Sequence, residues 1–307
     1  MLIINDINQL NIKTPVAVAI GKFDGVHVGH KSIISRILML KENGYKSLIF
    51  TFNPSPQSYF TGQEEKLIMT RAEKLKCFKE LGIDIVVEFP LNKVTAAISP
   101  ESFIKDILVD KLNTAFIAAG DDLSYGKGGK GDFALINKLG CEYGFEAECL
   151  SKNMYGRHVI SSTLIKKMLL EGEVLVAKEL LGDYYSVSGK IEPGKRLGRT
   201  IGFPTINIYP EKQKMLPLYG VYYSYTTIDN VRYKSITNIG IKPTVCDENK
   251  PVAETYIYNF DADVYGREAV VALIDYKRPE RKYDSVEELK AALENDIRDG
   301  KQYFRLK

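Results

Sequence analysis

The feature that most constrains this chain is a change of hydrophobic pattern near Gly182. Before it, nearly continuous apolar runs alternate with amphipathic stretches. The apolar runs predict buried strands at 16–20, 47–52, 83–89 and 114–119. The amphipathic stretches predict helices at 29–42, 71–81 and 100–112. Alternation of this kind indicates an α/β fold, with a parallel sheet covered by helices on both faces.

After Gly182 the strands follow one another without helices between them. They are expected at 184–191, 220–228, 231–239, 252–260 and 268–276. Asp229-Asn230 is a two-residue hairpin signal, and Ser285 with Glu288 forms a capping box that begins one terminal helix. This half therefore predicts an antiparallel barrel or sandwich. We expect two domains, 1–183 and 184–307, which meet through a helical stretch at 162–181.

The charge balance gives no support for the partners that a strongly basic chain would bind. Lys and Arg number 42 against 39 Asp and Glu, a net charge of +3, which favours neither nucleic acid nor a membrane surface. No apolar run approaches the roughly 20 residues that span a bilayer. The four cysteines form no CxxC pair, which is typical of reduced thiols in a cytoplasmic protein. The oligomeric state stays open.

One cluster in the first half carries chemistry. The strand at 16–20 runs into Gly21-Lys-Phe-Asp-Gly-Val-His27-Val-Gly29-His30, and a helix follows. A helix N-terminus at the carboxyl edge of a parallel sheet attracts anions, and glycines let the backbone approach them closely. Two of the three histidines of the chain can face the same phosphate there. The alternative is a glycine-rich turn whose histidines bond only the backbone. Zinc would need more ligands.

A second cluster lies after the change of pattern. Ser188-Gly189-Lys190 begins a basic, glycine-containing segment that reaches Thr205 and Asn207, two oxygen-bearing residues on one strand face. Such a segment suits nucleotide phosphates and a hard cation, although an ordinary basic loop followed by a strand is the alternative. The glycine-rich stretch 126–132 is no P-loop, because Asp132 stands where that motif requires lysine.

Together these segments resemble a known family. IGKFDGVHVGH (20–30) resembles the HxGH nucleotidyltransferases and, specifically, the bacterial bifunctional riboflavin kinase/FMN adenylyltransferases (FAD synthetases). Other motifs of the first half follow in order: TFNPSP (51–56), LIMTRAEKL (67–75), GDDLSYG (120–126) and ISSTLIKK (160–167). GFPTIN (202–207), Asn238-Ile-Gly240 with Pro243-Thr244, Glu254-Thr-Tyr-Ile and Lys277-Arg278-Pro-Glu resemble its kinase half. The resemblance covers nearly the full length.

The resemblance implies a Rossmann-like HxGH domain followed by an antiparallel β-barrel kinase domain with a terminal helix. It implies that riboflavin and ATP give FMN, and that FMN and ATP give FAD and pyrophosphate. In the first half, His27 and His30 would stabilise phosphate charge together with Mg²⁺. The other nucleotide-binding residues implied there are Gly21, Phe23, Asp24, Gly29, Asp122, Ser162, Thr163 and Lys166.

In the second half, Glu254 would be the base that accepts the proton of the ribityl hydroxyl, and Thr205 and Asn207 would hold Mg²⁺. The nucleotide-binding residues implied there are Gly189, Lys190, Lys195 and Arg199. The flavin-binding residues implied are Asn238, Gly240, Pro243, Thr244 and Arg278.

Several positions depart from the family pattern. Leu123, Ser124 and Tyr125 differ from the usual residues, and Lys166 replaces an arginine. Ser55 and Tyr256 each replace a histidine. Two alternatives stay open, and the departures at Leu123, Ser124 and Lys166 motivate the first. One is a riboflavin kinase whose adenylyltransferase half is impaired. The other is a non-catalytic flavin- or nucleotide-binding regulatory module, against which the reactive His27, His30 and Glu254 count.

Overall fold

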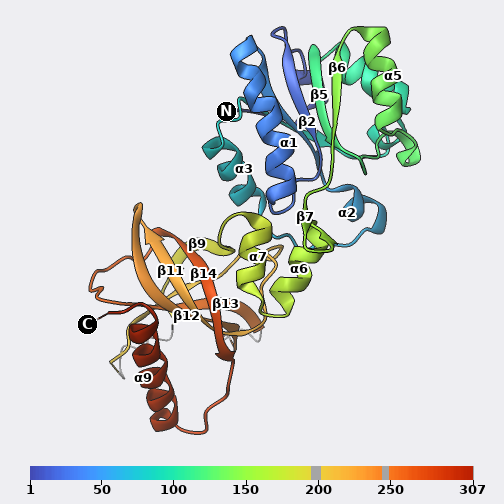
Figure 1. Ribbon diagram of the computed structural model, residues 1–307. Helices are drawn as coiled ribbons and strands as arrows, with labels where there is room; N and C mark the ends of the chain where they lie inside the picture. The colour runs from blue at the N-terminus through green and yellow to red at the C-terminus, as the bar shows by residue number, and fades with distance from the viewer. Residues whose placement is uncertain (195–201, 244–248, 307) are drawn as a thin grey trace. The chain divides into compact units, whose positions relative to one another are not determined.

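The computed structural model describes residues 1–194, 202–243 and 249–306 (Figure 1). The chain forms two compact units, Met1–Ser162 and Thr163–Lys307. The sequence-based domain boundary at 183 lies beyond the point where these units divide, since the helices α6 (Ser162–Leu170) and α7 (Val174–Leu181) fall almost wholly in the second unit. Where the functional domains divide therefore stays a prediction.

The first unit is built on a six-stranded sheet in the order β1-β4-β3-β2-β5-β6, and every neighbouring pair is parallel. The strands are β1 (Leu2–Ile4), β2 (Val16–Ile20), β3 (Lys46–Asn53), β4 (Ile85–Pro90), β5 (Thr114–Gly120) and β6 (Glu146–Leu150). The α/β prediction is confirmed, including its four buried strands. The sequence did not predict the edge strands β1 and β6, which lack a continuous apolar run.

Helices cover both faces of this sheet. Ile34 and Ile37 of α1 (Val28–Met39) and Phe78 of α3 (Arg71–Glu80) join one buried cluster. Ile136 of α5 (Phe133–Tyr143) and Ile104 of η4 (Phe103–Val109) join the cluster on the other face. Short elements complete the unit: η1 (Ile7–Gln9), η2 (Leu40–Asn43), α2 (Pro56–Thr61), η3 (Thr95–Ala97), α4 (Pro100–Ser102), η5 (Lys127–Gly129), β7 (Met154–Tyr155) and β8 (His158–Val159).

The strand order places a switch point at the middle of the sheet. From β2 the chain moves outward to β3 and β4, and then crosses back to add β5 on the other side of β2. The connections that leave β2 and β5 diverge at this point, which is where open α/β sheets bind ligands beyond the carboxyl ends of their strands. Gly21 to His30 follow β2, and Asp121 and Asp122 follow β5.

The second unit is a closed antiparallel barrel in the order β10-β13-β12-β11-β14-β9, with β9 also paired to β10. Its strands are β9 (Ser186–Glu192), β10 (Thr205–Ile208), β11 (Gly220–Ile228), β12 (Val231–Pro243), β13 (Asn249–Ile257) and β14 (Glu268–Pro279). The predicted hairpin is confirmed, since Asp229 and Asn230 both have positive φ between β11 and β12. Of the two predicted arrangements, the barrel is the one observed.

Hydroxyl groups fill part of the barrel interior. Ser224 contacts Ser235 and Thr237 at 2.7 Å each, and Thr237 contacts Thr255 at 2.9 Å. These side chains are fully buried, so each hydroxyl needs the partners it has. Because side chains alternate along a strand, inward Thr255 sends its neighbours Glu254 and Tyr256 to the outer face of β13.

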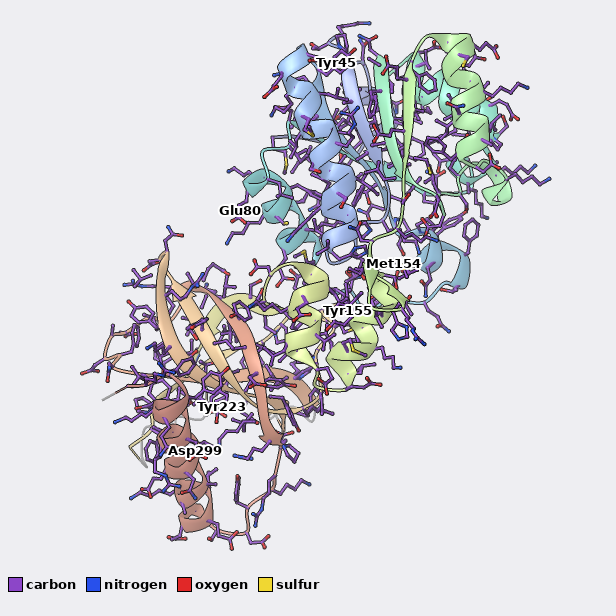
Figure 2. All side chains as sticks on the ribbon, in the orientation of Figure 1. Tyr45, Glu80, Met154, Tyr155, Tyr223 and Asp299 are labelled. Atoms are coloured by element: carbon purple, nitrogen blue, oxygen red, sulfur yellow. The ribbon has the colours of Figure 1, made fainter. Side chains whose placement is uncertain are left out.

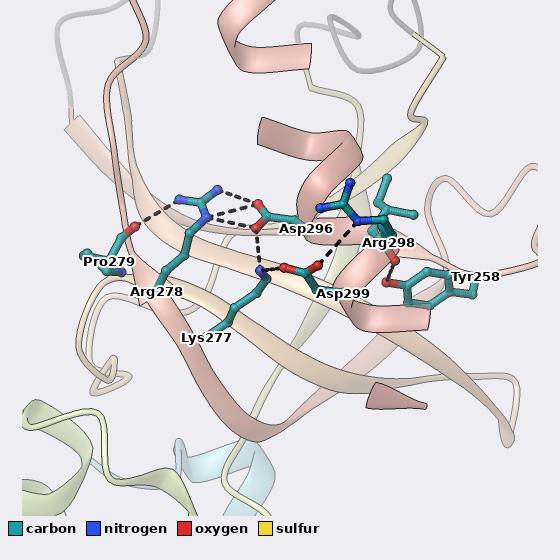
Figure 3. A network of polar contacts seen from close by, with 8 residues as sticks. Tyr258, Lys277, Arg278, Pro279, Asp296, Arg298 and Asp299 are labelled. Carbon is teal, nitrogen blue, oxygen red and sulfur yellow. Dashed lines mark hydrogen bonds and ion pairs between the residues drawn. The ribbon is translucent and has the colours of Figure 1, made fainter. Parts of the chain in front are cut away.

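The terminal helix α9 (Val286–Tyr303) is fixed to the end of β14 by ion pairs (Figure 3). Arg278 donates through Nε to both oxygens of Asp296, at 2.9 and 3.2 Å. Lys277 lies 3.2 Å from Asp296 and donates to Asp299 at 2.6 Å. Tyr223 of β11 stacks on Tyr303 with ring centroids 4.0 Å apart; Figure 2 labels Tyr223 and Asp299. The predicted terminal helix is thus a packed part of the barrel unit.

Candidate active sites

The first site begins with a strained turn between β2 and α1. Phe23 and Val26 have φ of 54° and 41°, a region that side-chain-bearing residues rarely adopt, and Gly25 between them has φ of 85°. Both non-glycine residues are fully buried. Each such conformation costs on the order of 1–3 kcal/mol and persists where the surrounding structure imposes it, most often at functional sites.

The two histidines stack on each other at the end of this turn. His27 is the N-cap of α1, and its Nδ1 accepts a hydrogen bond from the backbone N–H of His30 at 3.3 Å. The ring centroids lie 3.7 Å apart with 20° between the planes, and Phe23 packs edge-on against His30. Since Nδ1 of His27 accepts, the neutral ring carries its hydrogen on Nε2 as a donor.

Both imidazoles are held neutral. Burial lowers the pKa of His27 to about 4, although the negative charge of Asp122 opposes part of this shift. Burial also lowers the pKa of His30 well below its usual value, and the nearby His27 and Lys74 add to the effect. Near neutral pH the pair therefore offers N–H donors rather than full positive charges, beside the positive end of α1.

Smaller contacts shape the space around the histidines. A Cβ on Gly29 would lie 3.2 Å from the His27 ring, and one on Gly21 would lie 3.2 Å from the Phe23 ring. Asp24 is buried, and its carboxylate accepts the backbone N–H of Ile68 at 2.8 Å. The predicted glycines and Asp24 thus support the turn, and their predicted contact with a nucleotide stays a prediction.

Asp122 and Ser162 reach the same region. Asp122 follows β5, lies exposed and is near enough to His27 to act on its pKa. The hydroxyl of Ser162 donates to the Asp24 carbonyl at 2.9 Å. Thr163 and Lys166 continue α6 in the second unit, exposed and half-buried respectively, and their predicted roles stay predictions.

Sequence reasoning missed Lys74. Its ammonium group donates to the carbonyl of Lys22, inside the turn that carries the histidines, at 3.3 Å. In the sequence, this lysine is visible only as part of the family motif at 67–75, and the amphipathic pattern of α3 gives it no role.

The second site is a row of side chains on the outer face of the barrel. Glu254 of β13 pairs across the sheet with Asn207 of β10 on one side and with Asn238 of β12 on the other. Directly opposed residues on antiparallel strands point to the same face. The register therefore brings together a predicted base, a predicted metal ligand and a predicted flavin contact from three separate segments.

Thr205 completes this row. Its hydroxyl donates to Oε1 of Glu254 at 2.8 Å, which fixes the carboxylate and leaves the lone pairs of the hydroxyl oxygen for a cation. Asn207 is buried, and its side chain lies so close to Gly194 that a Cβ there would overlap it. No group of three or more His, Cys, Asp or Glu side chains placed to hold a metal occurs within the described residues.

The predicted flavin residues have partners of their own. The Asn238 amide donates to Oε1 of Glu280 at 3.3 Å, and that carboxylate lies directly over Gly240, where a Cβ would overlap it. Arg278 binds Asp296 of α9, as described above. Pro243 pairs through its backbone with Asn249, and Thr244 lies outside the described residues. Flavin contact stays a prediction for all five.

The basic segment is only partly described. Gly189 faces Ile208, whose Cγ2 would lie 2.9 Å from a Cβ at that position, so close packing of the strands explains this glycine. Lys190 is exposed on β9. Lys195 and Arg199 lie outside the described residues. Nucleotide binding by these four residues stays a prediction.

Comparison with known proteins finds one family model for each half of the chain. The family model of FAD synthetase matches residues 9–164, and that of riboflavin kinase matches residues 181–304. The bifunctional riboflavin kinase/FMN adenylyltransferase of Buchnera aphidicola subsp. Schizaphis graminum is 35% identical and covers 100% of both chains. Its Escherichia coli (strain K12) counterpart is 35% identical over 94% of this chain and 92% of its own.

This chain belongs to the bifunctional riboflavin kinase/FMN adenylyltransferase family. The family-level expectation from the motifs is thereby confirmed, with one match for each structural unit. The roles of individual residues rest on their geometry and are proposed below.

A solved structure shares the whole architecture. A chain from Streptococcus pneumoniae, described as a macrolide-efflux protein, superposes with a TM-score of 0.85 at 26% identity and covers 97% of each chain. Within the part of this chain that the structure describes, no helix combines the length and apolar character needed to cross a membrane. The Streptococcus pneumoniae chain thus shares the fold, although its description names a different function.

Proposed function

We propose that this chain carries out two consecutive reactions: it phosphorylates riboflavin with ATP to give FMN, and it adenylylates FMN with a second ATP to give FAD and pyrophosphate. Family membership supports both reactions. The observation that carries the proposal is that each unit gathers its own reactive groups: His27 stacks on His30 in the first, and Glu254 bonds Thr205 in the second.

In the first unit, a phosphate oxygen of FMN attacks the α-phosphate of ATP, and pyrophosphate leaves. His27 donates from Nε2 to a phosphate oxygen, and the backbone N–H groups that begin α1 face the same anion. The strained turn holds these donors before substrate arrives, so little reorganisation accompanies the reaction. Ser162 steadies the turn through the Asp24 carbonyl.

In the second unit, the ribityl 5′-hydroxyl of riboflavin attacks the γ-phosphate of ATP. Glu254 accepts the proton of that hydroxyl as the new oxygen–phosphorus bond forms. Thr205 holds the Glu254 carboxylate by its 2.8 Å hydrogen bond. Asn238, directly across from Glu254, is placed to contact the flavin.

The residues around Glu254 fit a magnesium ion that arrives with ATP. Mg²⁺ prefers oxygen ligands and commonly takes only one or two from the protein, the others coming from water and phosphate. The hydroxyl of Thr205 and the amide oxygen of Asn207 lie on one strand face beside one carboxylate, which matches that requirement. When bound, the ion would neutralise charge on the transferring phosphate.

We further propose that the protein acts in the cytoplasm, where ATP is available, with small molecules as its partners. The test supplies ATP and Mg²⁺ with either riboflavin or FMN and separates the flavins by chromatography. FAD from FMN together with FMN from riboflavin supports the proposal. FMN from riboflavin alone supports the kinase-only alternative, and no product in either reaction supports the binding module.

A further inference from the structure

Lys74 lies where a cation can act on the first site. It belongs to the first turn of α3, whose start is fixed by a capping box between Thr70 and Glu73. Its ammonium group donates to the Lys22 carbonyl at 3.3 Å, and Lys22 separates Gly21 from Phe23 in the turn that leads to the histidines. The helix α3 therefore places a lysine against the turn, although α3 is not part of that turn.

One acidic group that acts on the pKa of Lys74, Glu88, is already bound by another residue. Glu88 of β4 is only 3% exposed, and Arg71 donates through Nε to both of its oxygens at 2.8 and 3.1 Å. A second guanidinium nitrogen of Arg71 lies 2.5 Å from Oε2. Among the residues that the structure describes, no carboxylate lies within 4.0 Å of the Lys74 ammonium group, which donates to the Lys22 carbonyl instead.

The positive charge of Lys74 acts on the pKa of His30. It contributes to lowering the pKa of His30, so the ammonium group lies within electrostatic reach of that ring. Burial lowers the pKa of Lys74 itself, while Glu88 and Asp24 oppose the shift. A half-buried cation without a contacting carboxylate, beside two neutral imidazoles and a helix N-terminus, forms a site that an anion would stabilise.

We propose that Lys74 is a third catalytic residue of FMN adenylylation, which contacts the phosphate groups held at His27 and His30. This rests on the proposed function. As the FMN phosphate oxygen bonds to the α-phosphorus, the bond from that phosphorus to the bridging oxygen breaks, and its electron pair leaves with pyrophosphate. Lys74 donates hydrogen bonds to this developing charge and transfers no proton.

The competing explanation is structural: Lys74 merely ties α3 to the turn. Lys74→Gln separates the two, because an amide can still donate to the Lys22 carbonyl but carries no charge. Lys76→Gln is the matched control, since Lys76 lies on the same helix, is 65% exposed and is 3.9 Å from Glu80. Surface pairs of that kind contribute little to stability.

We expect Lys74→Gln to lower kcat for FAD formation from FMN by a factor of about 10²–10³. Removal of one hydrogen-bond donor that stabilises transition-state charge lowers kcat by this amount in other enzymes. Riboflavin phosphorylation and the thermal unfolding midpoint should stay at wild-type values, and Lys76→Gln should match wild type in all three. Lys74→Arg keeps the charge and should be at least about tenfold faster than Lys74→Gln, which supports the proposal even if neutralisation lowers the midpoint.

Two results overturn the proposal while leaving the proposed function intact. One is a Lys74→Gln variant whose FAD formation stays within about threefold of wild type. The other is equal loss in the Arg and Gln variants, which would indicate a geometric tie rather than a charge. A wild-type protein that forms no FAD from FMN overturns both the proposed function and the role of Lys74.

Discussion

The two sites are encoded in different ways. The two histidines of the first lie within consecutive residues, Gly21 to His30, which turn between one strand and one helix. The second is assembled by register, because Asn207, Glu254 and Asn238 come from three strands and meet only when the barrel closes. A contiguous site stores its geometry in local backbone conformation, whereas a cross-strand site depends on the pairing of the whole sheet.

This difference leads to different sensitivities. The first site holds its donors through a strained turn and buried rings, so burial and protonation should affect it strongly. In the second, Thr205 of β10 donates a hydrogen bond to the carboxylate of Glu254 on the neighbouring strand β13. The following predictions test this contrast, beginning with the largest effect.

Replacement of the proposed base should separate the two chemistries most strongly. Glu254→Gln nearly preserves size and can still bond Thr205, but it accepts no proton effectively near neutral pH. FMN formation from riboflavin should fall by on the order of 10²–10⁴, while FAD formation from supplied FMN should continue at the wild-type rate. Chromatography of both reactions measures this. A variant that keeps most of its kinase rate would show that another group is the base.

Loss of the buried acid on α9 should destabilise the barrel unit. Asp296 is 2% exposed and contacts two cations, so Asp296→Asn leaves Lys277 and Arg278 short of their counter-charge. We expect the free energy of unfolding of that unit to fall by about 2–4 kcal/mol, and denaturant titration followed by tyrosine fluorescence measures it.

Asp299→Asn is the matched control, because Asp299 is 38% exposed and forms ion pairs with Lys277 and Arg298. Its loss should reduce the free energy of unfolding by less than about 1 kcal/mol. Equal effects of the two variants would contradict a special role for the buried carboxylate in fixing α9.

Acid should act on the first unit, since all three histidines of the chain lie there. The pKa of His27 is about 4 when folded against 6.5 as the reference, so between these values the unfolded chain binds more protons. The free energy of unfolding of the first unit should thus decrease as pH falls. His27 alone should account for a decrease of about 2 kcal/mol between about pH 7 and pH 5.

Unfolding of wild type and His27→Gln at the two pH values measures this contribution. The variant should lose about 2 kcal/mol less than wild type on acidification. Identical pH dependence in wild type and His27→Gln would mean that His27 is not held neutral by burial.

The same contrast explains how much the sequence could predict. Buried strands such as β2 and caps such as Thr70 were predictable, because apolar runs and capping boxes act locally. The helix α5 was not predicted, although Asp132 is its N-cap, and the glycine-rich stretch directly before it gives no helical signal. The edge strands β1 and β6 escaped because their half-exposed sequences lack a continuous apolar signal.

For the sites, the limit lies in tertiary contacts. His27 and His30 are three residues apart on one turn, so their meeting follows from helix geometry. The hydrogen bond from Thr205 to Glu254 could be expected only through the family resemblance, because the sequence of a single strand does not determine its register in the barrel. Two further contacts depend on packing between elements and cannot be predicted from sequence spacing. One joins Arg278 to Asp296, and the other joins Lys74 to Lys22.

The central claim is that each unit carries one complete reaction, and a mixing experiment tests it most directly. One variant is Glu254→Gln, and the other is the double variant His27→Ala with His30→Ala. Each is incubated alone, and then both together, with riboflavin, ATP and Mg²⁺. We predict almost no product from the first, FMN alone from the second, and FAD from the mixture, because FMN released by one protein serves the other. A mixture that yields only FMN, or a double variant that still forms FAD, would contradict the claim.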